Sequence, residues 1–279
     1  MHLILVHIGP DFPPYLNDCI LQISKITSIP IHVLLPKNLI QHLQHTVYVH
    51  PIEDLSSPYI DHFESQSILD SSFRNGFWKY ATMRFFYIHA YASKHNLEDV
   101  FHIEYDNLIY YDFTKHINTF RQRDAWIILD SENRCIPSFM YFRNHSSIQR
   151  ILPHLIQSSK NGMNDMTSLA SYYRFQGGRV GLLPIINDYK EPIPFQYYEH
   201  ASEFQCIFDG ACVGQYIGGV DPRNTPGDTT GFINETSIFR CDNCTIEWRT
   251  IDNLKRPFLN NIPLVNLHIH SKDLKRWAS

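Results

Sequence analysis

Two carboxylates stand two residues apart directly after an apolar run in the middle of the chain. Glu104 and Asp106 follow residues 100–103, Val-Phe-His-Ile, a pattern typical of a buried strand. Side chains at i and i+2 of an extended backbone project to one side, so both carboxylates can reach one cation. In open α/β sheets, ligands bind outside the carboxyl ends of the strands. The pair therefore predicts a divalent-metal site facing a phosphate; the simpler alternative is an acidic turn at a strand end.

A second polar pair lies near the C-terminal end of the sequence. His268 and His270 are again two residues apart, and Lys272 follows them. Imidazole and carboxylate ligands together suit Mn²⁺ or a similar divalent ion. A lysine adds a positive charge for a phosphate. We therefore expect His268 or His270, or both, to complete the metal site, although most of the 16 histidines in this chain are expected to be structural.

Taken together, these two motifs resemble those of the GT-A glycosyltransferases. Glu104-Tyr105-Asp106 is similar to the DxD motif of that superfamily, with Glu in place of the first Asp. His270-Ser271-Lys272 is similar to the His-Ser-basic ending of some members. The resemblance implies a GT-A-like fold, Mn²⁺ or Mg²⁺ as the cofactor, and transfer of a sugar from a nucleotide-sugar donor to a hydroxyl acceptor such as a glycan.

Further residues are expected to contact the substrates. Arg84, on the helix before the metal strand, and Lys272 would stabilise negative charge on a departing diphosphate. For Arg84 the alternative is a role in helix packing. The loop that follows the first strand, at residues 6–9, would flank the nucleotide base. The remaining substrate-binding candidates are Lys79, Tyr105, Asn107 and Gly9.

If the reaction inverts configuration, a carboxylate must take the proton from the attacking hydroxyl. Asp209 lies in a segment punctuated by glycine, where a ligand can approach the backbone closely. Asp165 lies where a helix is expected to begin, and its alternative role is that of a helix-capping acid. Both remain catalytic candidates from the sequence.

A loop rich in Gly, Pro, Asp and Thr at residues 216–235 is long for a compact domain and is typical of a lid or binding loop. Its side chains and nearby aromatic residues are candidates for binding sugars, with ordinary turn chemistry as the alternative. The polar candidates are Asp221, Arg223, Asp228 and, outside the loop, Asp130; the stacking candidates are Trp126, Trp248 and Tyr216.

The elements expected around these motifs alternate between strand and helix, which predicts an α/β fold with a Rossmann-like, mostly parallel sheet flanked by helices. One domain is expected, with residues 1–112 as the nucleotide-sugar half and residues 113–279 as a more irregular acceptor-side half. Strands are expected at residues 2–8, 31–35, 46–50, 100–103, 125–129, 139–142, 180–183 and 263–270. Helices are expected at residues 16–26, 39–43, 77–94, 147–157 and 165–174.

Composition narrows the possible functions. The net charge is -4, from 24 basic and 28 acidic residues, so a nucleic-acid partner is not expected. The apolar start has no signal-peptide pattern and no run reaches membrane-span length, which predicts a soluble, cytoplasmic protein. Cys241-Asp-Asn-Cys244 has the spacing of a zinc or redox motif, without a matching second pair.

Two other functions remain open from the sequence. A metal-dependent phosphohydrolase or nucleotidyltransferase would use the same carboxylates but needs a second carboxylate cluster for a second metal. A non-catalytic carbohydrate-binding protein would keep the fold without the chemistry, because fold does not determine function.

Overall fold

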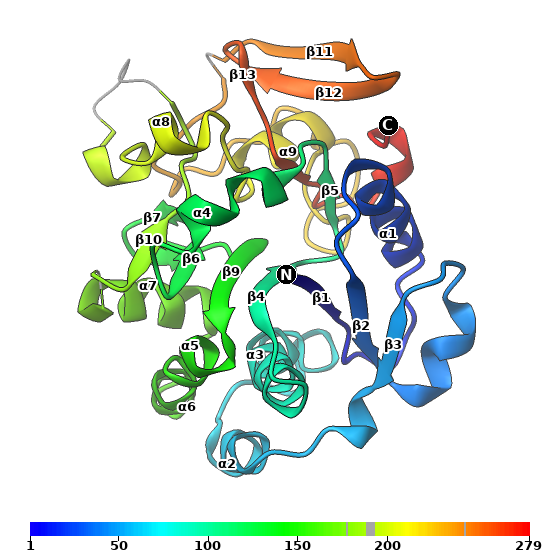
Figure 1. Cartoon of the computed structure of the whole chain (residues 1–279), viewed down its shortest axis with the longest axis vertical. Helices are drawn as coiled ribbons and strands as arrows, with labels where there is room; N and C mark the ends of the chain where they lie inside the picture. Colours follow the sequence, from blue (N-terminus) through cyan, green and yellow to red (C-terminus); the bar gives the residue numbers. More distant parts are fainter. Residues whose placement is uncertain (177, 188–192, 243) are drawn as a thin grey trace.

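A seven-stranded sheet runs through the centre of the molecule in the order β10-β6-β9-β4-β1-β2-β3 (Figure 1). This computed structural model describes residues 1–176, 178–187, 193–242 and 244–279. The strands are β1 (His2–Val6), β2 (Ile31–Leu35), β3 (Tyr48–Pro51), β4 (Glu98–Ile103), β6 (Ala125–Ile127), β9 (Phe139–Asn144) and β10 (Val180–Leu182). Neighbouring strands are parallel, except that β9 is antiparallel to both β4 and β6. The expected α/β fold with a mostly parallel sheet is confirmed.

Helices cover both faces of this sheet. Figure 1 shows α2, α3, α5 and α6 below it and α1, α4 and α9 above it. The α-helices are α1 (Tyr15–Ile26), α2 (Pro58–Gln66), α3 (Phe77–Lys94), α4 (Ile117–Phe120), α5 (His145–Gln149), α6 (Leu152–Ser159), α7 (Asp165–Gln176), α8 (Ala201–Phe204) and α9 (Cys212–Gly218). Short 3₁₀ helices are η1 (Lys37–His42), η2 (Ile52–Asp54), η3 (Phe73–Asn75), η4 (Phe113–His116), η5 (Phe195–Tyr197) and η6 (Leu274–Arg276).

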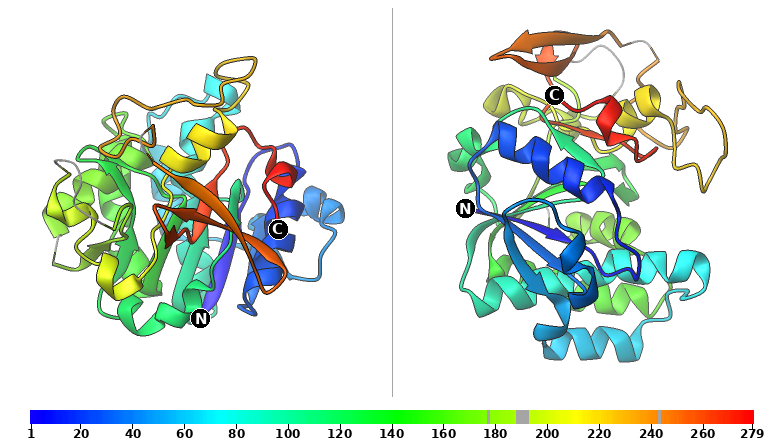
Figure 2. Two further views of the ribbon diagram at one scale, coloured as in Figure 1. Left: turned by 90° about the horizontal axis from the view of Figure 1, so that it is seen from above. Right: turned by 90° about the vertical axis from the view of Figure 1, so that its right-hand side faces the viewer.

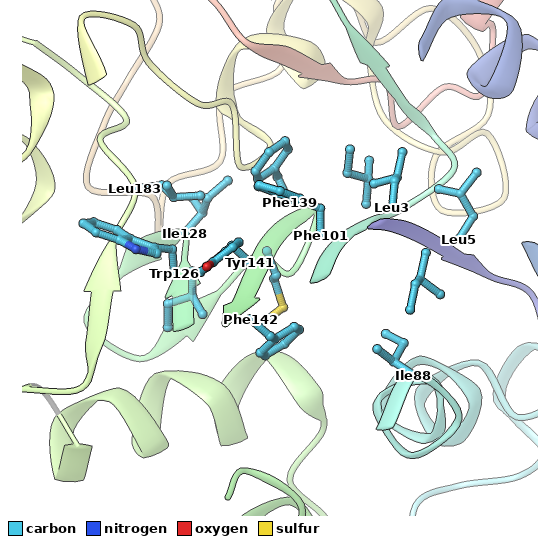
Figure 3. Close-up of a cluster of buried hydrophobic side chains, with 14 of the residues drawn as sticks. Leu3, Leu5, Ile88, Phe101, Trp126, Ile128, Phe139, Tyr141, Phe142 and Leu183 are labelled. Carbon is cyan, nitrogen blue, oxygen red and sulfur yellow. The ribbon is translucent and has the colours of Figure 1, made fainter. Parts of the chain in front are cut away.

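Aromatic side chains fill the core around the middle strands (Figure 3). The Phe101 ring lies 5.0 Å from that of Phe120 and 5.1 Å from that of Tyr141. Burial of each such side chain contributes about 1.5–3 kcal/mol before entropy is counted. Trp126, considered above as a stacking face for sugars, belongs to this core: it is fully buried, and its indole Nε1 donates to the Phe120 carbonyl. That expectation is wrong because the ring has no exposed face.

A two-stranded ladder joins the middle of the chain to its end. β5 (Asn107–Ile109) pairs antiparallel with β14 (Asn266–His268), and His268 lies opposite Asn107. Since β5 follows the Glu104–Asp106 motif directly, this register carries the C-terminal histidines to the acidic pair. The two motifs, far apart in sequence, are therefore neighbours because of one short pair of strands.

The C-terminal region is more regular than expected. β11 (Ile246–Ile251), β12 (Leu254–Leu259) and β13 (Ile262–Pro263) form a small antiparallel sheet at one end of the molecule (Figure 2). Its turns place Asp252, Asn253, Asn260 and Asn261 at φ of 53, 61, 47 and 70°. Positive φ at both central residues is typical of type I′ hairpin turns, for which Asn and Asp are well suited.

Two other local differences have simple causes. The helix expected at residues 147–157 is divided into α5 and α6, because Pro153 lies in the first turn of α6, where a missing N–H costs least. The strand expected at residues 125–129 is divided into β6 and β7 (Leu129–Ser131), and β7 pairs with β8 (Arg134–Cys135). Among the described residues, no helix combines the length and apolar character that crossing a membrane requires.

Candidate metal and substrate site

Glu104, Asp106 and His268 converge on one point. The Nε2 atom of His268 lies 3.4 Å from Glu104 Oε2 and 3.2 Å from Asp106 Oδ2. One ligand atom from each residue lies within 4.8 Å of the other two, which is the spacing of a set that can hold one metal ion. Two carboxylates and an imidazole are ligands that suit Mn²⁺ and related divalent ions. This donor set fits the expected cation.

The carboxylates converge for a reason that differs from the one expected. β4 ends at Ile103, and the Asn107 amide donates to the Glu104 carbonyl at 3.0 Å, so residues 104–107 form a turn. The two side chains therefore meet across a turn between β4 and β5, and strand alternation does not explain their approach.

Asn107, expected to bind substrate, has a structural role in this turn. It is fully buried, and its amide nitrogen donates to the carbonyls of Glu104 and Ser138, both at 3.2 Å. Its amide oxygen accepts from Asn266 at 2.7 Å. The expectation for Asn107 is corrected: it ties β5 to β14 and holds the turn that carries the acids.

His268 is oriented by a backbone contact behind it. Its Nδ1 lies 2.6 Å from the Gly210 carbonyl and donates to it, which leaves the Nε2 lone pair facing the carboxylates in the neutral ring. Burial disfavours the imidazolium, but Asp106 and Glu104 outweigh burial and raise the pKa of His268 to about 9. A proton and a divalent cation are thus attracted to the same place, and they compete for it.

His270 supports His268 and does not join the cluster. Its Nε2 lies 3.3 Å from His268 Nδ1, and its Nδ1 lies 2.7 Å from Gln215 Nε2. Burial, reinforced by the positive charges of His268 and Lys272, holds the pKa of His270 well below its usual value. Of the two candidate ligands, the geometry selects His268.

Each carboxylate of the motif also has a cationic partner. Lys272 forms an ion pair with Asp106, and Arg84 forms one with Glu104 and a second, at 2.7 Å, with Asp165. Burial raises the carboxyl pKa values, but Arg84 outweighs it at Glu104, and His268 with Lys272 outweighs it at Asp106. Both carboxyl pKa values therefore lie below their usual range, and both groups are charged.

Asp165 lies beside this cluster at the first residue of α7. It is only 1% exposed, and burial raises its pKa even though Arg84 offsets part of the effect. Its Oδ1 atom has no hydrogen-bond partner among the described residues. Because Asp165 also lines the cavity described below, its position agrees with the expected role of a catalytic carboxylate without testing it.

The carboxylate of Asp209, the other catalytic candidate, accepts hydrogen bonds from backbone amides. The donors are the amides of Val213, Gly214 and His268, at 3.0, 2.8 and 2.9 Å. Those bonds cap the start of α9 and attach it to β14. The residue is 2% exposed and does not line the cavity, so the structure places Asp209 behind His268 and gives it a positioning role in place of the expected contact with the cavity.

A cavity of about 690 Å³ is lined in part by Glu104, Asp106 and His268. Gly9 and Tyr105 line it as expected, together with Lys272 and Arg84, whereas Lys79 is half-buried on α3 and does not. The Tyr105 hydroxyl lies 2.9 Å from His7 Nδ1, and this contact joins the loop after β1 to the turn at residues 104–107.

Aromatic residues that were not expected to bind substrate form a rim along this cavity. Phe73 and Phe77 are 43% and 38% exposed, and the Phe73 ring stacks on Trp78 with centroids 6.2 Å apart. The available signal was the run Phe73-Arg-Asn-Gly-Phe-Trp78, in which three aromatic residues gather just before and at the start of α3. Exposed aromatic faces at a cavity mouth can hold a ring-shaped ligand.

The long loop after α9 also lines the cavity, beside the segment that carries the aromatic rim. Asp221 and Arg223 line it, and Asp221 accepts from Arg74 at 3.3 Å and from Arg223 at 2.7 Å. Burial opposes ionisation of Asp221, but hydrogen bonds from Arg223 outweigh it and lower the pKa to about 2.

The other candidates from the sequence lie outside the cavity lining. Asp228 caps a turn through Thr230, and Asp130 is paired with Arg134. Trp248 stacks on Trp277 with centroids 6.1 Å apart, and Tyr216 is half-buried on α9. For these residues the structure supports packing or turn roles.

Comparison with known proteins gives distant structural likeness only. Neither the protein-family models nor the curated proteins compared with the sequence give a match. Among solved structures, GT-A glycosyltransferases match over most of the chain. Apo mouse xyloside xylosyltransferase 1 is 10% identical, with a TM-score of 0.49, over 73% of this chain and 92% of that one.

Two structures of the galactosyltransferase LgtC are similarly distant. The complex with donor and acceptor sugar analogues is 12% identical, with a TM-score of 0.44, over 66% of this chain and 73% of that one. A structure of an active-site mutant of LgtC is 13% identical, with a TM-score of 0.47, over 70% of this chain and 81% of that one. At this distance the functional inference depends on the site geometry of this chain.

Proposed function

We propose that this protein is a metal-dependent glycosyltransferase that moves a sugar from a nucleotide-sugar donor to a hydroxyl acceptor. The observation that carries the proposal is the convergence of Glu104, Asp106 and His268 at the wall of a cavity. Lys272 and Arg84 add positive charge at the same wall. A diphosphate is negatively charged, so a bound cation together with Lys272 and Arg84 would attract it.

On the donor side, Glu104, Asp106 and His268 would hold Mn²⁺ or Mg²⁺, and this cation would neutralise negative charge on the leaving diphosphate. The Lys272 ammonium would bind the diphosphate as a point charge, and the Arg84 guanidinium would hold Glu104 in place. The cavity volume, about 690 Å³, is within the usual range for small-molecule sites. Gly9 and Tyr105 would contact the nucleoside.

On the acceptor side, Asp165 is the carboxylate proposed to take the proton from the attacking hydroxyl. Two observations support this role. Asp165 lies in the cavity wall, and its Oδ1 atom accepts no hydrogen bond from any described residue. The Arg84 ion pair would fix its orientation. The exposed rings of Phe73 and Phe77 would provide an apolar face for the acceptor.

The proposed division into a nucleotide half at residues 1–112 and an acceptor half at residues 113–279 stays a prediction. In this scheme the metal site belongs to both halves, because β14 of the second half pairs with β5 of the first.

The phosphohydrolase or nucleotidyltransferase alternative is less well supported. Two-metal phosphoryl transfer places two ions about 3.5–4 Å apart, each with its own ligands. Within the described ranges, Glu104, Asp106 and His268 form the one group of metal-ligand side chains with suitable spacing. The geometry therefore favours chemistry with a single metal ion.

The test is a panel of UDP-, GDP- and CMP-sugars, measured for Mn²⁺-dependent binding by calorimetry and for slow hydrolysis. We expect at least one donor to bind and hydrolyse only with Mn²⁺, and Asp106→Ala to abolish both. Asp61→Ala, at an exposed position on α2, serves as the matched control.

Failure takes distinct forms. Absence of binding to every donor, with or without Mn²⁺, contradicts the proposal. Binding without hydrolysis or transfer to any tested acceptor supports the non-catalytic carbohydrate-binding alternative. Unchanged binding in Asp106→Ala refutes the carboxylate assignment.

A further inference from the structure

His102 is a buried histidine of the cavity wall whose two ring nitrogens have different surroundings. It lies on β4, two residues before Glu104, and is 1% exposed. Its Nδ1 lies 2.9 Å from the Ile4 carbonyl on β1 and must donate to it, because a carbonyl oxygen can only accept. Its Nε2 has no hydrogen-bond partner among the described residues, and the residue lines the cavity.

The Nε2 atom of His102 is a hydrogen-bond acceptor. A charged imidazolium buried to this extent would be costly unless a carboxylate paired with it. The carboxylates nearest in the site have other partners: Glu104 pairs with Arg84 and lies beside His268, and Asp165 pairs with Arg84. The ring is therefore neutral, and because its hydrogen is on Nδ1, a lone pair remains on Nε2.

Two other atoms at the same wall are also without partners. The Phe85 ring contacts both His102, with centroids 6.0 Å apart, and the Arg84 guanidinium, whose central carbon lies 5.1 Å from the ring centroid. Arg84 in turn pairs with Asp165. In the part of the chain that the structure describes, Arg84 Nε and Asp165 Oδ1 have no hydrogen-bond partner, and both residues line the cavity at no more than 8% exposure. Because buried polar groups are nearly always hydrogen-bonded, three such atoms indicate that a polar ligand completes them.

The three atoms define what that ligand must offer. Arg84 Nε donates a hydrogen bond, whereas His102 Nε2 and Asp165 Oδ1 accept one. A hydroxyl group suits each of them, because it both donates and accepts. An apolar group would leave all three unsatisfied, with a desolvation cost for each. A ring that carries several hydroxyl groups therefore fits this wall better than an apolar substituent does.

We propose that His102 selects the sugar that is transferred, because its Nε2 accepts a hydrogen bond from one hydroxyl of the donor sugar. The Arg84 Nε would donate to an oxygen of the same sugar, and Asp165 would still face the attacking hydroxyl. This inference rests on the proposed glycosyl transfer and adds a requirement to it: the donor sugar carries a free hydroxyl at the position that faces His102. A site built to bind a hydroxyl rejects an analogue that lacks it, since the buried partner is then left unpaired.

The experiment replaces the hydroxyls of the donor sugar by fluorine, one at a time. Fluorine is similar in size to a hydroxyl but has no hydrogen to donate to Nε2. The parent compound is the UDP-, GDP- or CMP-sugar that binds best in the donor panel with Mn²⁺, and calorimetry measures the affinities. We expect one position at which fluorine weakens binding to the wild-type chain about tenfold or more.

His102→Phe keeps a ring at this position and removes the acceptor. In this variant the parent compound should bind as weakly as the analogue fluorinated at the critical position, while the free nucleotide should bind as it does to the wild type. His102→Gln, whose amide oxygen can accept, should restore part of the preference. His89→Phe is the matched control and should keep the full preference. His89 is also a buried histidine with a ring nitrogen that no described residue contacts by a hydrogen bond, but it does not line the cavity.

Equal binding of the parent and of every fluorinated analogue to the wild type overturns the inference, as does a preference that persists unchanged in His102→Phe. Those results leave the proposed function intact, whereas failure of every nucleotide sugar to bind contradicts both.

If His102→Phe does not fold, or loses nucleotide binding equally, ¹⁵N NMR of the wild-type imidazole decides the question. The His102 Nε2 resonance should respond to the parent compound, and much less to the free nucleotide or to the analogue fluorinated at the critical position. The same response to all three ligands would overturn the inference.

Discussion

His268 combines the contacts that a metal-binding histidine requires. A backbone carbonyl accepts from one ring nitrogen, and two carboxylates face the other. Such outer contacts fix the tautomer and increase the basicity of the ligand. His270 lacks this arrangement because both of its ring nitrogens are directed at neighbouring side chains. His268 and His270 are two residues apart and look equivalent in the sequence, but their hydrogen-bond partners give them different roles.

Lys272 offers a test of phosphate binding. Its ammonium group is paired with Asp106 at the cavity wall, so Lys272→Met removes a positive charge and little volume. We expect the affinity for UDP and GDP in the presence of Mn²⁺ to fall about tenfold, equivalent to about 1.4 kcal/mol. Calorimetry measures the change.

Lys275→Met is the matched control, since Lys275 is exposed on η6 and does not line this cavity. Equal losses in the two variants would show that the effect comes from net charge, and no loss in Lys272→Met would remove Lys272 from the site.

At residue scale the sequence predicts that Glu104 and Asp106 meet a C-terminal histidine, because their residue types and spacing suit a cation. It leaves the choice between His268 and His270 open, and the structure places His268 beside the two carboxylates. Asp209 and Asn107 were wrongly assigned because a sequence shows which groups accept hydrogen bonds, but not that backbone amides and carbonyls will occupy them. Which backbone groups bond to Asp209 and Asn107 depends on how segments far apart in the sequence pack together in the fold.

At the scale of elements, the site depends on the packing of α9 against β14. Asp209 attaches the start of α9 to the His268 amide, and Gly214 allows the two backbones to approach. A Cβ atom at Gly214 would lie 2.1 Å from the His268 carbonyl oxygen. Because the obstacle is backbone, the helix and strand would have to separate.

Gly214→Ala is therefore expected to lower the free energy of unfolding by about 1–3 kcal/mol or more, the usual cost of overpacking. It should also weaken Mn²⁺ binding, because β14 carries His268. Urea denaturation and a Mn²⁺ titration measure the two effects.

Gly178→Ala is the comparison, since no atom of another described residue lies within 4 Å of a Cβ atom at that position. Its effect should stay within about 0.5 kcal/mol. A Gly214→Ala protein as stable as Gly178→Ala would contradict the proposed packing constraint.

Elements with strong apolar patterns were predictable. The boundaries of α3 and β2 agree with the expected ranges, 77–94 and 31–35, because buried apolar runs mark them. The hairpin β11–β12 was missed because β11 is largely exposed, and because the buried residues of β12 are consecutive and follow charged ones, so neither strand shows the alternation of a half-buried strand. Its turn residues, Asp252 and Asn253, were the available signal.

At the scale of the whole molecule, a histidine network outside the site makes stability depend on pH. His32 Nε2 lies 3.0 Å from His2 Nδ1, and its Nδ1 lies 2.9 Å from the Tyr91 hydroxyl, which also contacts His50. Burial, with the neighbouring histidines His2, His50 and His95, lowers the pKa of His32 to about 4 from 6.5. The folded protein therefore keeps this ring neutral where the unfolded chain takes up a proton.

The contribution of neutral His32 is fully present above pH 6.5 and decreases as the pH falls toward about 4. We expect the melting temperature to drop between pH 7 and pH 4.5, and His32→Gln to drop less over that range. His62→Gln, at an exposed position on α2, should follow the wild type. Identical pH profiles for wild type and His32→Gln would show that this network does not contribute.

The most direct test of the whole account is a titration of the protein with Mn²⁺, followed by electron paramagnetic resonance. We predict one bound ion per chain, loss of that ion in both Asp106→Ala and His268→Ala, and its retention in His270→Ala. Mn²⁺ binding that survives in Asp106→Ala and His268→Ala would contradict the account, because the ion would then lie elsewhere.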